Sequence, residues 1–450
     1  MKNKYEMDMC SGRIFPKMLR FTLPLLATAI LQLLYNAADM VVVGKFAGST
    51  ALAAVGSTAS LIALFVNLFI NISVGVGVAV ALHYGATEEK AVSETLHTAV
   101  VFSLSAGVVI GIIGFFAARS MLQLMDTPAD VIDQAVLYVK IYFLAAPANL
   151  LYNFGAAALR SVGDTRRPLL YLTVSGLAND VLNLFFVICF GMQAEGVALA
   201  TAISQVLSAV LVVRCLLKNE GCCRLQIGEL RIHRGRLREI IRIGLPAGLQ
   251  SAVFSISNVL IQSGVNSFGS IVMAGNSISN NLENFVYSGM NSVTQASMSF
   301  VGQNVGGRKY ERISKITVTG LAMVLTVGAV IGSIMFFFGE PLLGLYSSDA
   351  LVVDKGMLRL RQMVFGYLLA GMMELFAFET RGMGQSVIPM ICTIFGVCVL
   401  RVAWVYTVFQ AFHTLEVLYL AYPITWGITV LLQFFFYRRT KRKLTIARIS

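Results

Sequence analysis

Charged residues are scarce in this 450-residue chain: they make up 13% of it, whereas 57% of the residues are hydrophobic. Such a composition is typical of a protein that crosses a membrane several times. The sequence contains no Gly-x-x-x-x-Gly-Lys-Ser/Thr loop, which argues against an ATP-driven pump. Its four histidines are scattered and form no His-Glu-x-x-His motif, so a membrane metalloprotease is not indicated. We therefore predict that the chain is not an enzyme.

Cysteine is also rare. The seven cysteines show no pair with metal-ligand spacing, and most fall in segments that we place in the cytoplasm or in the membrane. They imply neither a metal site nor a disulfide framework. We predict no bound metal and no cofactor.

Long apolar runs are what the chain has in abundance. Each run of about 20 or more residues is long enough to cross a bilayer as a helix. In the first half these runs lie near residues 15–43, 51–82, 95–118, 132–157, 168–190 and 195–217. In the second half they lie near residues 240–265, 271–302, 313–338, 355–380, 387–411 and 416–437. We predict an all-α polytopic membrane protein with 12 transmembrane helices.

A nine-residue pattern occurs twice. Arg160-Ser-Val-Gly-Asp-Thr-Arg-Arg-Pro168 returns 221 residues later as Arg381-Gly-Met-Gly-Gln-Ser-Val-Ile-Pro389, with Arg, one Gly, a hydroxyl residue and Pro in the same places. Arg20-Phe-Thr-Leu-Pro24 likewise returns as Arg242-Ile-Gly-Leu-Pro246. The halves are therefore related, and we predict two pseudo-symmetric six-helix bundles. The expected division is an N-lobe at 1–217, a cytoplasmic linker at 218–239 and a C-lobe at 240–450.

Lysine and arginine are distributed unevenly between the two sides of the predicted membrane. Segments on one side hold 28 of the 35, and segments on the other side hold three. By the positive-inside rule, the richer side and both termini lie in the cytoplasm. We predict a multi-pass protein of the inner (cytoplasmic) membrane, surrounded by the lipid bilayer. The net charge of +12 follows from this topology and requires no nucleic-acid partner.

Polar side chains share one face of the first span. Gln32, Tyr35 and Asp39 are spaced three and four residues apart, as on one side of a helix. A carboxylate inside a membrane helix costs about 2.5–3.5 kcal/mol on insertion, so it usually faces water or a partner. A position for Asp39 at the outer end of the helix, near the interface, is the alternative. Pro24 lies in the middle of this span, and we predict that it acts as a hinge.

The fifth and sixth spans add further polar groups. The fifth contains Asn179, Asp180 and Asn183, and the sixth contains Thr201. Together with Asp39 they form a candidate proton or sodium site, because a carboxylate removed from water can exchange a proton. A salt bridge within the bundle is the alternative for Asp180.

The second half keeps the same frame with different polar residues. A polar face follows the span at 271–302, and such a face must line water or protein. We predict a substrate cavity formed by Asn276, Asn280, Glu283, Asn284, Tyr287, Met290, Glu374 and Arg401. Methionine suits a pocket for varied apolar ligands, although ordinary packing is the alternative for Met290.

Two ion pairs are predicted in the second half. Arg401 is expected to pair with an acid, either Glu374 or Glu283, and the sequence does not choose between them. Glu379 and Arg381 are expected to form an ion pair at the inner end of their span, and a role for Glu379 in transport is the alternative.

These residues together resemble the multidrug and toxic compound extrusion (MATE) family of transporters, in its bacterial branch. The resemblance covers essentially the whole chain, and the combination of motifs is specific although single pieces are weak. The matching motifs in the first half are Asp39 with Gly44, Leu159-Arg-Ser-Val-Gly-Asp164, and Asn179 followed by Gly196-Val-Ala-Leu-Ala-Thr201. Those in the second half are Leu245-Pro246, Gly302-Gln-Asn304, Arg381-Gly-Met-Gly384 and Arg401 to Trp404.

The resemblance implies a two-lobed antiporter with a central cleft, which exports amphipathic, often cationic compounds in exchange for H⁺ or Na⁺ by alternating access. It also implies a cation site in the N-lobe, formed by Asp39, Asn179 and Thr201 with Gln32, Tyr35 and Asn153 nearby. Many relatives carry an acid where this chain has Asn183, so either Asp180 supplies a second carboxylate or Asp39 acts alone.

Such a transporter needs no second subunit to form its path, and we predict a monomer. A flippase for a lipid-linked precursor and a non-transporting membrane scaffold or sensor are the alternative functions.

Overall fold

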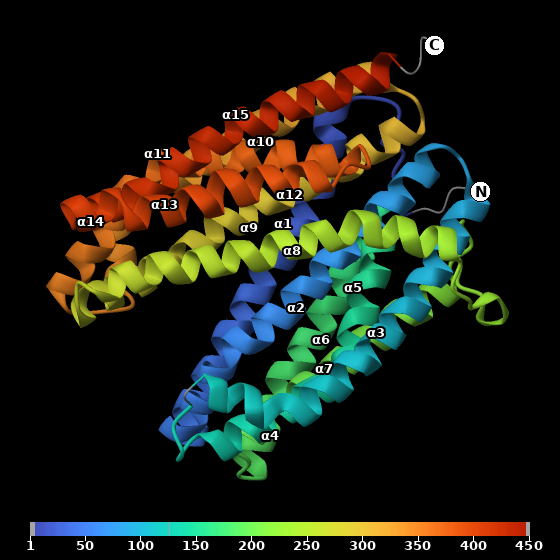
Figure 1. Cartoon of the computed structure of the whole chain (residues 1–450). Coiled ribbons are helices and arrows are strands. Elements are labelled where there is room, and N and C mark those ends of the chain that lie inside the picture. The colour runs from blue at the N-terminus through green and yellow to red at the C-terminus, as the bar shows by residue number, and fades with distance from the viewer. Residues whose placement is uncertain (1–4, 126, 447–450) are drawn as a thin grey trace. The chain divides into compact units, whose positions relative to one another are not determined.

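Helices make up almost all of the computed structural model, which describes residues 5–125 and 127–446 (Figure 1). No β-strand occurs among these residues. The helices of the first half are α1 (Ile14–Val42), α2 (Gly48–Gly85), α3 (Glu89–Leu124), α4 (Ile132–Leu144), α5 (Ala146–Ser161), α6 (Arg166–Leu184) and α7 (Ala194–Leu217). Those of the second half are α8 (Arg234–Asn266), α9 (Ser270–Gly306), α10 (Tyr310–Gly344), α11 (Ala350–Gly382), α12 (Val387–Thr393), α13 (Leu400–Tyr406), α14 (Val408–Phe412) and α15 (Leu415–Ile446).

The apolar runs of the sequence correspond to these helices. In the described part of the chain, ten continuous helical stretches are long and apolar enough to cross a membrane, and α4 with α5 adds an eleventh as one bent span. The remaining long helix is α9, which has 37 residues and coincides with the predicted span at 271–302. Its polar face lowers its hydropathy, but most of its residues from Gly289 to Asn304 are buried in protein. A helix that is shielded from lipid in this way tolerates polar side chains.

The fourth span is bent by 46° between α4 and α5. Pro147 lies at the start of α5. Proline has no backbone N–H and its ring clashes with the preceding turn, so α4 cannot continue through it. A Cβ atom on Gly107 of α3 would lie 2.4 Å from the Pro147 Cα atom, which shows how closely α3 approaches the bend.

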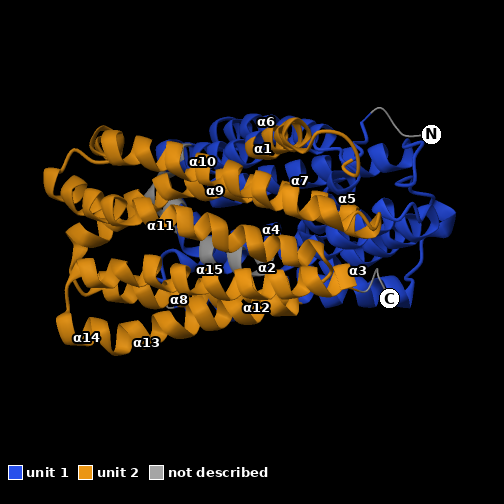
Figure 2. Ribbon diagram, turned by 90° about the horizontal axis from the view of Figure 1, so that it is seen from above, with its two compact units in different colours: residues 1–8, 27–245 blue, residues 9–26, 246–450 orange. Residues whose placement is uncertain are grey.

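Packing divides the chain into two compact units (Figure 2). Unit 1 comprises residues 1–8 and 27–245, and unit 2 comprises residues 9–26 and 246–450. The boundary inside α1 follows Pro24 closely, and the boundary inside α8 lies directly before Pro246. Both boundaries therefore fall at the proline of the repeated Arg-x-x-Leu-Pro pattern.

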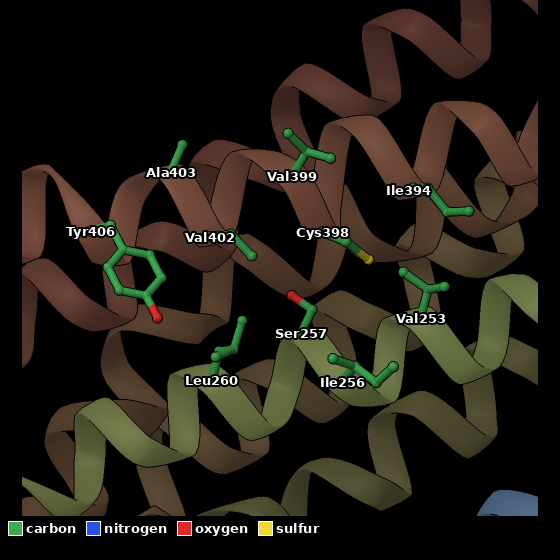
Figure 3. Close-up of a pocket in the computed structure, with 10 residues that line it drawn as sticks. All are labelled: Val253, Ile256, Ser257, Leu260, Ile394, Cys398, Val399, Val402, Ala403 and Tyr406. Atoms are coloured by element: carbon green, nitrogen blue, oxygen red, sulfur yellow. The ribbon is translucent and has the colours of Figure 1, made fainter.

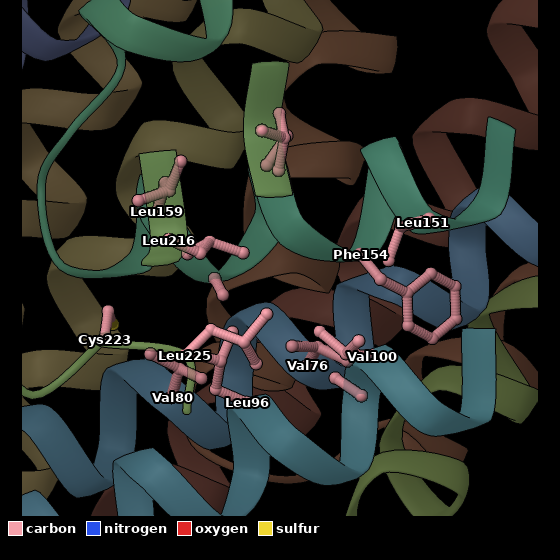
Figure 4. Close-up of a cluster of buried hydrophobic side chains, with 14 of the residues drawn as sticks. Val76, Val80, Leu96, Val100, Leu151, Phe154, Leu159, Leu216, Cys223 and Leu225 are labelled. Carbon is pink, nitrogen blue, oxygen red and sulfur yellow. The ribbon is translucent and has the colours of Figure 1, made fainter. Parts of the chain in front are cut away.

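An apolar cluster in unit 1 joins five helices, α2, α3, α5, α7 and α8, and the linker (Figure 4). It contains Val76 of α2, Leu96 of α3, Phe154 of α5 and Leu216 of α7, and the linker contributes Leu225. The linker is also held by a hydrogen bond of 3.0 Å from the backbone nitrogen of Gln226 to His97 Nε2. The segment after α7 is thus packed onto unit 1.

Two glycines allow α2 and α8 to cross closely within unit 1. A Cβ atom on Gly75 would lie 2.2 Å from the carbonyl oxygen of Ile240, and one on Gly244 would lie 2.3 Å from that of Ile72. Small residues permit this kind of backbone approach between membrane helices. The first part of α8 is therefore fixed to unit 1.

Three π-helical segments interrupt the spans: η1 (Val43–Ala47), η2 (Phe185–Cys189) and η4 (Ile394–Val399). The segment η1 begins four residues after Asp39, η2 begins two residues after Asn183, and η4 ends two residues before Arg401. Segments of this kind are frequent at functional sites because the extra residue redirects side chains on the helix.

Candidate functional site

Unit 1 encloses a polar cavity of about 640 Å³. The cavity lies among α1, α2, α4, α5, α6 and α7. The residues predicted for ion coupling that line it are Gln32, Tyr35, Asp39, Asn153, Asn179 and Thr201. Helices far apart in the sequence thus bring these side chains to one cavity.

The Asp39 carboxylate is held by amide groups of α6. Asn183, which is fully buried, donates a hydrogen bond from Nδ2 to Asp39 Oδ1. When the Asn179 amide is turned so that its nitrogen faces Asp39, it donates to the same oxygen at 2.9 Å, and its own oxygen accepts from the Thr201 backbone nitrogen at 3.2 Å. Neither a lysine nor an arginine of the described chain forms an ion pair with Asp39. The amide hydrogen bonds therefore favour its negative charge without cancelling it, whereas burial and the nearby Asp180 act against that charge.

The Asn179 side chain also contacts α7. One end of its amide lies 3.3 Å from Ser204 Oγ and 3.4 Å from Thr201 Oγ1, and the other end lies 3.2 Å from Asn183 Nδ2. The hydroxyl oxygens of Thr201 and Ser204 therefore contact Asn179, which lies between them and the Asp39 carboxylate. Both hydroxyl groups are neutral and line the same cavity.

Asp180 does not line the cavity with Asp39. It acts on Asp39 electrostatically, but its Oδ1 atom is buried and has no hydrogen-bond partner in the described chain. Neighbouring residues of a helix point in directions about 100° apart, so Asp180 faces away when Asn179 faces the cavity. The position four residues after Asn179 is filled by the Asn183 amide, which contacts Asp39 directly.

The remaining predicted residues line the cavity at its sides. The Tyr35 hydroxyl donates to the carbonyl oxygen of Thr173 at 3.3 Å, and Asn153 Nδ2 donates to the side chain of Asn149 at 3.1 Å. A Cβ atom on Gly176 would lie 2.0 Å from the Tyr35 ring, so a glycine is required there. Sequence reasoning missed Gly176, and it also missed two aromatic side chains of α4 that line the cavity, Tyr138 and Tyr142.

Unit 2 encloses a second polar cavity of about 560 Å³ among α8, α9, α11 and α15. The residues predicted for the substrate cavity that line it are Asn280, Glu283, Asn284, Tyr287 and Glu374. Asn258 and Gln262 of α8 and Tyr422 and Trp426 of α15 complete much of the wall. This cavity thus has more aromatic and amide surface than free charge.

Glu283 forms a buried ion pair with Arg359 of α11. Arg359 donates from Nε to Glu283 Oε1 at 2.8 Å and from Nη2 to Oε2 at 2.9 Å. The guanidinium group also donates from Nη1 to Asn276 Oδ1 at 2.5 Å and lies 5.3 Å from the centre of the Tyr419 ring. The two charged residues are 2% and 3% exposed. A bidentate pair of this kind neutralises both charges, so Glu283 offers no free negative charge to the cavity.

The predicted ion pair between Arg401 and Glu283 is wrong. Arg401 donates from Nη1 to Asn258 Oδ1 at 2.9 Å, and its guanidinium group lies 4.2 Å from the centre of the Tyr422 ring. Within the described residues it donates to no carboxylate, so the pairing with Glu374 is wrong as well. Aromatic faces attract a guanidinium group electrostatically, and they replace the expected acid here.

Glu374 is the acid of this cavity that no base neutralises by direct contact. It lines the cavity, and Arg381, which acts on it electrostatically, donates instead to Gln250 Oε1 at 2.7 Å. The carboxyl group of Glu374 therefore lines the cavity without a direct ionic partner.

Two predicted cavity residues lie behind the wall. Asn276 is buried and accepts hydrogen bonds from Arg359 and Tyr419. Met290 is fully buried and packs against Gly371, where a Cβ atom would lie 2.8 Å from its sulfur. Ordinary packing is thus what Met290 does in this structure.

The predicted ion pair between Glu379 and Arg381 is also wrong. Glu379 instead contacts the hydroxyl groups of Ser297 and Thr317 within hydrogen-bonding distance. Residues two apart on a helix point to different sides, which separates the two charges.

A third cavity, of about 460 Å³, lies beside α8 in unit 2 and faces η4 and α13 (Figure 3). Its wall is formed by apolar side chains such as Ile256, Leu260 and Val402, and no charged residue lines it. It therefore offers no binding site for an ion.

Two polar cavities inside bundles of membrane-crossing helices define a membrane transport protein. A family model for MatE matches residues 24–185 and matches again at residues 246–407. The two matches start 222 residues apart, at the offset of the repeated Arg-x-x-Leu-Pro pattern. The chain belongs to the MATE family of multidrug efflux transporters.

Individual relatives agree with this assignment. The chain is 27% identical over 447 residues to the probable multidrug resistance protein YoeA of Bacillus subtilis. This match covers 97% of this chain and 96% of that protein. It is 22% identical to the multidrug export protein MepA of Staphylococcus saprophyticus, over 83% of this chain and 82% of that protein. A solved structure described as the outward-facing conformation of a multidrug resistance MATE family transporter superposes with a TM-score of 0.92 at 22% identity, over 99% of this chain and 100% of that chain.

These findings confirm the predicted fold class and family. The protein is an all-α polytopic membrane protein with twelve transmembrane helices in two bundles, and it is a transporter rather than an enzyme.

Proposed function

We propose that the protein is a secondary antiporter that exports amphipathic, often cationic organic compounds in exchange for H⁺ or Na⁺ by alternating access. The observation that supports this most strongly is the Asp39 carboxylate, which lines a cavity and is held by the neutral amide of Asn183. An acid that is stabilised but not neutralised can take up and release a cation.

Ion binding at Asp39 drives transport only if its free energy differs between the outward-open and inward-open states. The hydrogen bond from the Asn183 amide to Asp39 connects the ion site on α1 with α6. Binding of a cation at Asp39 changes the acceptor of this hydrogen bond, so ion binding and the contact between the two helices are linked.

The cavity of unit 2 supports the proposed substrate class. Glu374 offers a carboxyl group without a direct ionic partner, which can carry a negative charge when a cation is bound, while Tyr287, Tyr422 and Trp426 offer aromatic faces. A carboxylate and aromatic rings are the groups that bind organic cations. Because Arg359 neutralises Glu283, we assign the attraction of the cation to Glu374.

The remaining parts of the proposal follow from the fold and the charges. Pro24 is the proposed bend in α1, since the boundary between the two compact units lies next to it. We place the protein in the inner (cytoplasmic) membrane with both termini in the cytoplasm, as the positive-inside rule requires. It is proposed to act as a monomer in the bilayer.

The experiment that tests this function is ethidium flux in proteoliposomes, with a proton gradient and a sodium gradient imposed separately. We expect one gradient to drive flux in the wild-type protein, and we expect Asp39→Asn to reduce flux to the level of protein-free liposomes. If folded wild-type protein gave no flux under either gradient, ion-coupled drug export would be the wrong function, and a specialised substrate such as a lipid-linked precursor would replace it.

A further inference from the structure

A buried carboxyl group in unit 2 lies away from both polar cavities. Glu379, close to the end of α11, has an exposed fraction of 0%. Ser297 of α9 donates to its Oε1 atom at 2.5 Å, and the Thr317 hydroxyl of α10 lies 2.7 Å from its Oε2 atom. The Tyr437 hydroxyl of α15 lies 2.6 Å from the same Thr317 oxygen. Four helices therefore converge on this one carboxyl group.

The bases nearest in sequence and space are engaged elsewhere. Lys441 of α15, which acts on Glu379 electrostatically, donates to Ser314 Oγ at 2.5 Å. Arg381 follows Glu379 on α11 but donates to Gln250. No ion pair to Glu379 is found in the described chain. A buried carboxylate without a paired cation is strongly unfavourable, and such a group normally becomes neutral.

The hydrogen atoms of the cluster can be counted. Thr317 Oγ1 has short contacts to three oxygens: Glu379 Oε2, Tyr437 Oη and, at 2.8 Å, the carbonyl oxygen of Ile313. A hydroxyl group has one hydrogen to donate and two lone pairs that accept. If Glu379 is ionised, the single Thr317 hydrogen can be donated either to the Ile313 carbonyl oxygen or to Glu379. The contact that does not receive it then holds two electron-rich oxygens together without a hydrogen.

A proton on Glu379 completes the network. Glu379 then donates from Oε2 to Thr317, Tyr437 donates to Thr317, and Thr317 donates to the Ile313 carbonyl oxygen, as hydroxyl residues commonly do four residues back along a helix. Ser297 still donates to Oε1. Every short contact is then a hydrogen bond. A metal ion does not fit, because oxygens at 2.5–2.7 Å are already in direct contact.

We propose that Glu379 binds a proton, so that unit 2 contains a protonation site separate from Asp39 in unit 1. The neutral carboxyl group links α9, α10 and α11 as both donor and acceptor, and Thr317 extends the network to Tyr437 of α15. Loss of this proton would leave a buried charge and one contact without a hydrogen. We therefore expect the stability of unit 2 to fall at alkaline pH.

Infrared spectroscopy of the full-length protein in liposomes tests the proposal without any transport assay. We expect the wild-type spectrum at neutral pH to contain a carbonyl-stretching band of a protonated carboxylic acid, and Glu379→Gln to remove it. Thr317→Val, which removes the acceptor of the proton, should shift this band. Asp39→Asn and Glu374→Gln should leave it in place. An unchanged set of bands in folded Glu379→Gln protein would overturn the proposal.

Thermal unfolding provides the second readout. The amide of Glu379→Gln can accept from Ser297 and donate to Thr317, as the neutral acid does. We therefore expect its melting temperature to equal that of the wild type at neutral pH, and to fall less than the wild-type value as pH is raised. The matched control is Glu340→Gln, at an exposed glutamate of α10, which should retain the wild-type decline. A Glu379→Gln protein that unfolds at neutral pH would contradict the proposal, since an ionised acceptor would then be essential.

Discussion

Unit 1 and unit 2 arise from related halves of the sequence, yet they treat their acids in different ways. In unit 1 the Asp39 carboxylate is held by the neutral amide of Asn183. In unit 2 the Glu283 carboxylate is held by the guanidinium group of Arg359. Amides stabilise a negative charge without cancelling it, whereas a bidentate guanidinium group cancels it. One repeated scaffold can therefore leave one acid, Asp39, available to ions and hold another, Glu283, in a buried ion pair.

A second difference concerns equivalent positions of the two halves. Asp180 and Arg401 are 221 residues apart, at the offset of the repeated nine-residue pattern, and they carry opposite charges. Each has one buried polar atom without a hydrogen-bond partner in the described chain, Oδ1 in Asp180 and Nη2 in Arg401. The two equivalent positions therefore carry charged residues of opposite sign.

Removal of Arg359 should have the largest effect. In Arg359→Ala, Glu283 stays buried without its cation, and breaking a buried pair typically costs about 3–5 kcal/mol. Thermal unfolding of the purified protein in detergent measures the loss. Arg361→Ala, at an exposed position two residues further along α11, is the control and should change stability by less than about 0.5 kcal/mol.

The double variant Glu283→Gln/Arg359→Gln sharpens this prediction. It removes both charges together, so most of the stability lost in Arg359→Ala should return. If Arg359→Ala were as stable as the wild type, Glu283 would not be neutralised by this pair, and the contrast between the two units would fail.

Removal of the Asn183 amide should have an intermediate effect. Asn183→Ala takes away a donor to Asp39 in a buried place, and an unsatisfied buried acceptor costs about 1–3 kcal/mol. The same unfolding assay measures it. The control Asn281→Ala, at an exposed position of α9, should change stability little. An equal loss of stability in the two variants would show that the hydrogen bond from Asn183 to Asp39 does not stabilise the fold.

Neutralisation of Glu374 should have the smallest effect and should concern binding alone. Glu374→Gln is expected to raise the Kd for a cationic dye roughly tenfold, which corresponds to about 1.4 kcal/mol, and to leave the Kd for a neutral dye unchanged. Fluorescence titration of the purified protein measures both values. Asp354→Asn, an exposed acid of α11, should alter neither. An equal loss for both dyes would mean that Glu374 shapes the cavity rather than attracting charge.

Much of the fold could be predicted from the sequence because the bilayer requires long apolar helices. The α9 helix was predicted in spite of its polar residues, since these follow one face and leave an apolar face for packing. The bend between α4 and α5 was not predicted, although Pro147 was the signal for it in the sequence. The π-helical segments were not predicted either.

Helical spacing alone places Gln32, Tyr35 and Asp39 on one side of α1, and the structure shows all three lining the unit 1 cavity. Their role in ion coupling stays a prediction. The sequence could not indicate which group of α6 contacts Asp39. That depends on the rotation of α6 about its own axis, which turns Asn183 toward Asp39 and leaves Asp180 outside the cavity.

The ion pair of unit 2 was missed because it depends on two helices coming close together. Ser279 of α9 donates to the carbonyl oxygen of Gly356 of α11 at 3.0 Å, and Gly275 lies against Val352. Small residues on both helices permit this approach. Glu283 is one turn beyond Ser279, and Arg359 is nearly one turn beyond Gly356, so the pair follows once the contact is known. The small residues were the signal that could have identified it.

The central claim is that the exchangeable ion binds at Asp39 in unit 1 and not at the ion pair of unit 2. Its most direct test is to impose an ethidium gradient on proteoliposomes and to record proton and sodium movement. We predict ion movement in the wild type and in Glu283→Gln/Arg359→Gln, and none in Asp39→Asn, although this variant still binds ethidium. Ion movement that persists in Asp39→Asn and disappears in the double variant would contradict the account.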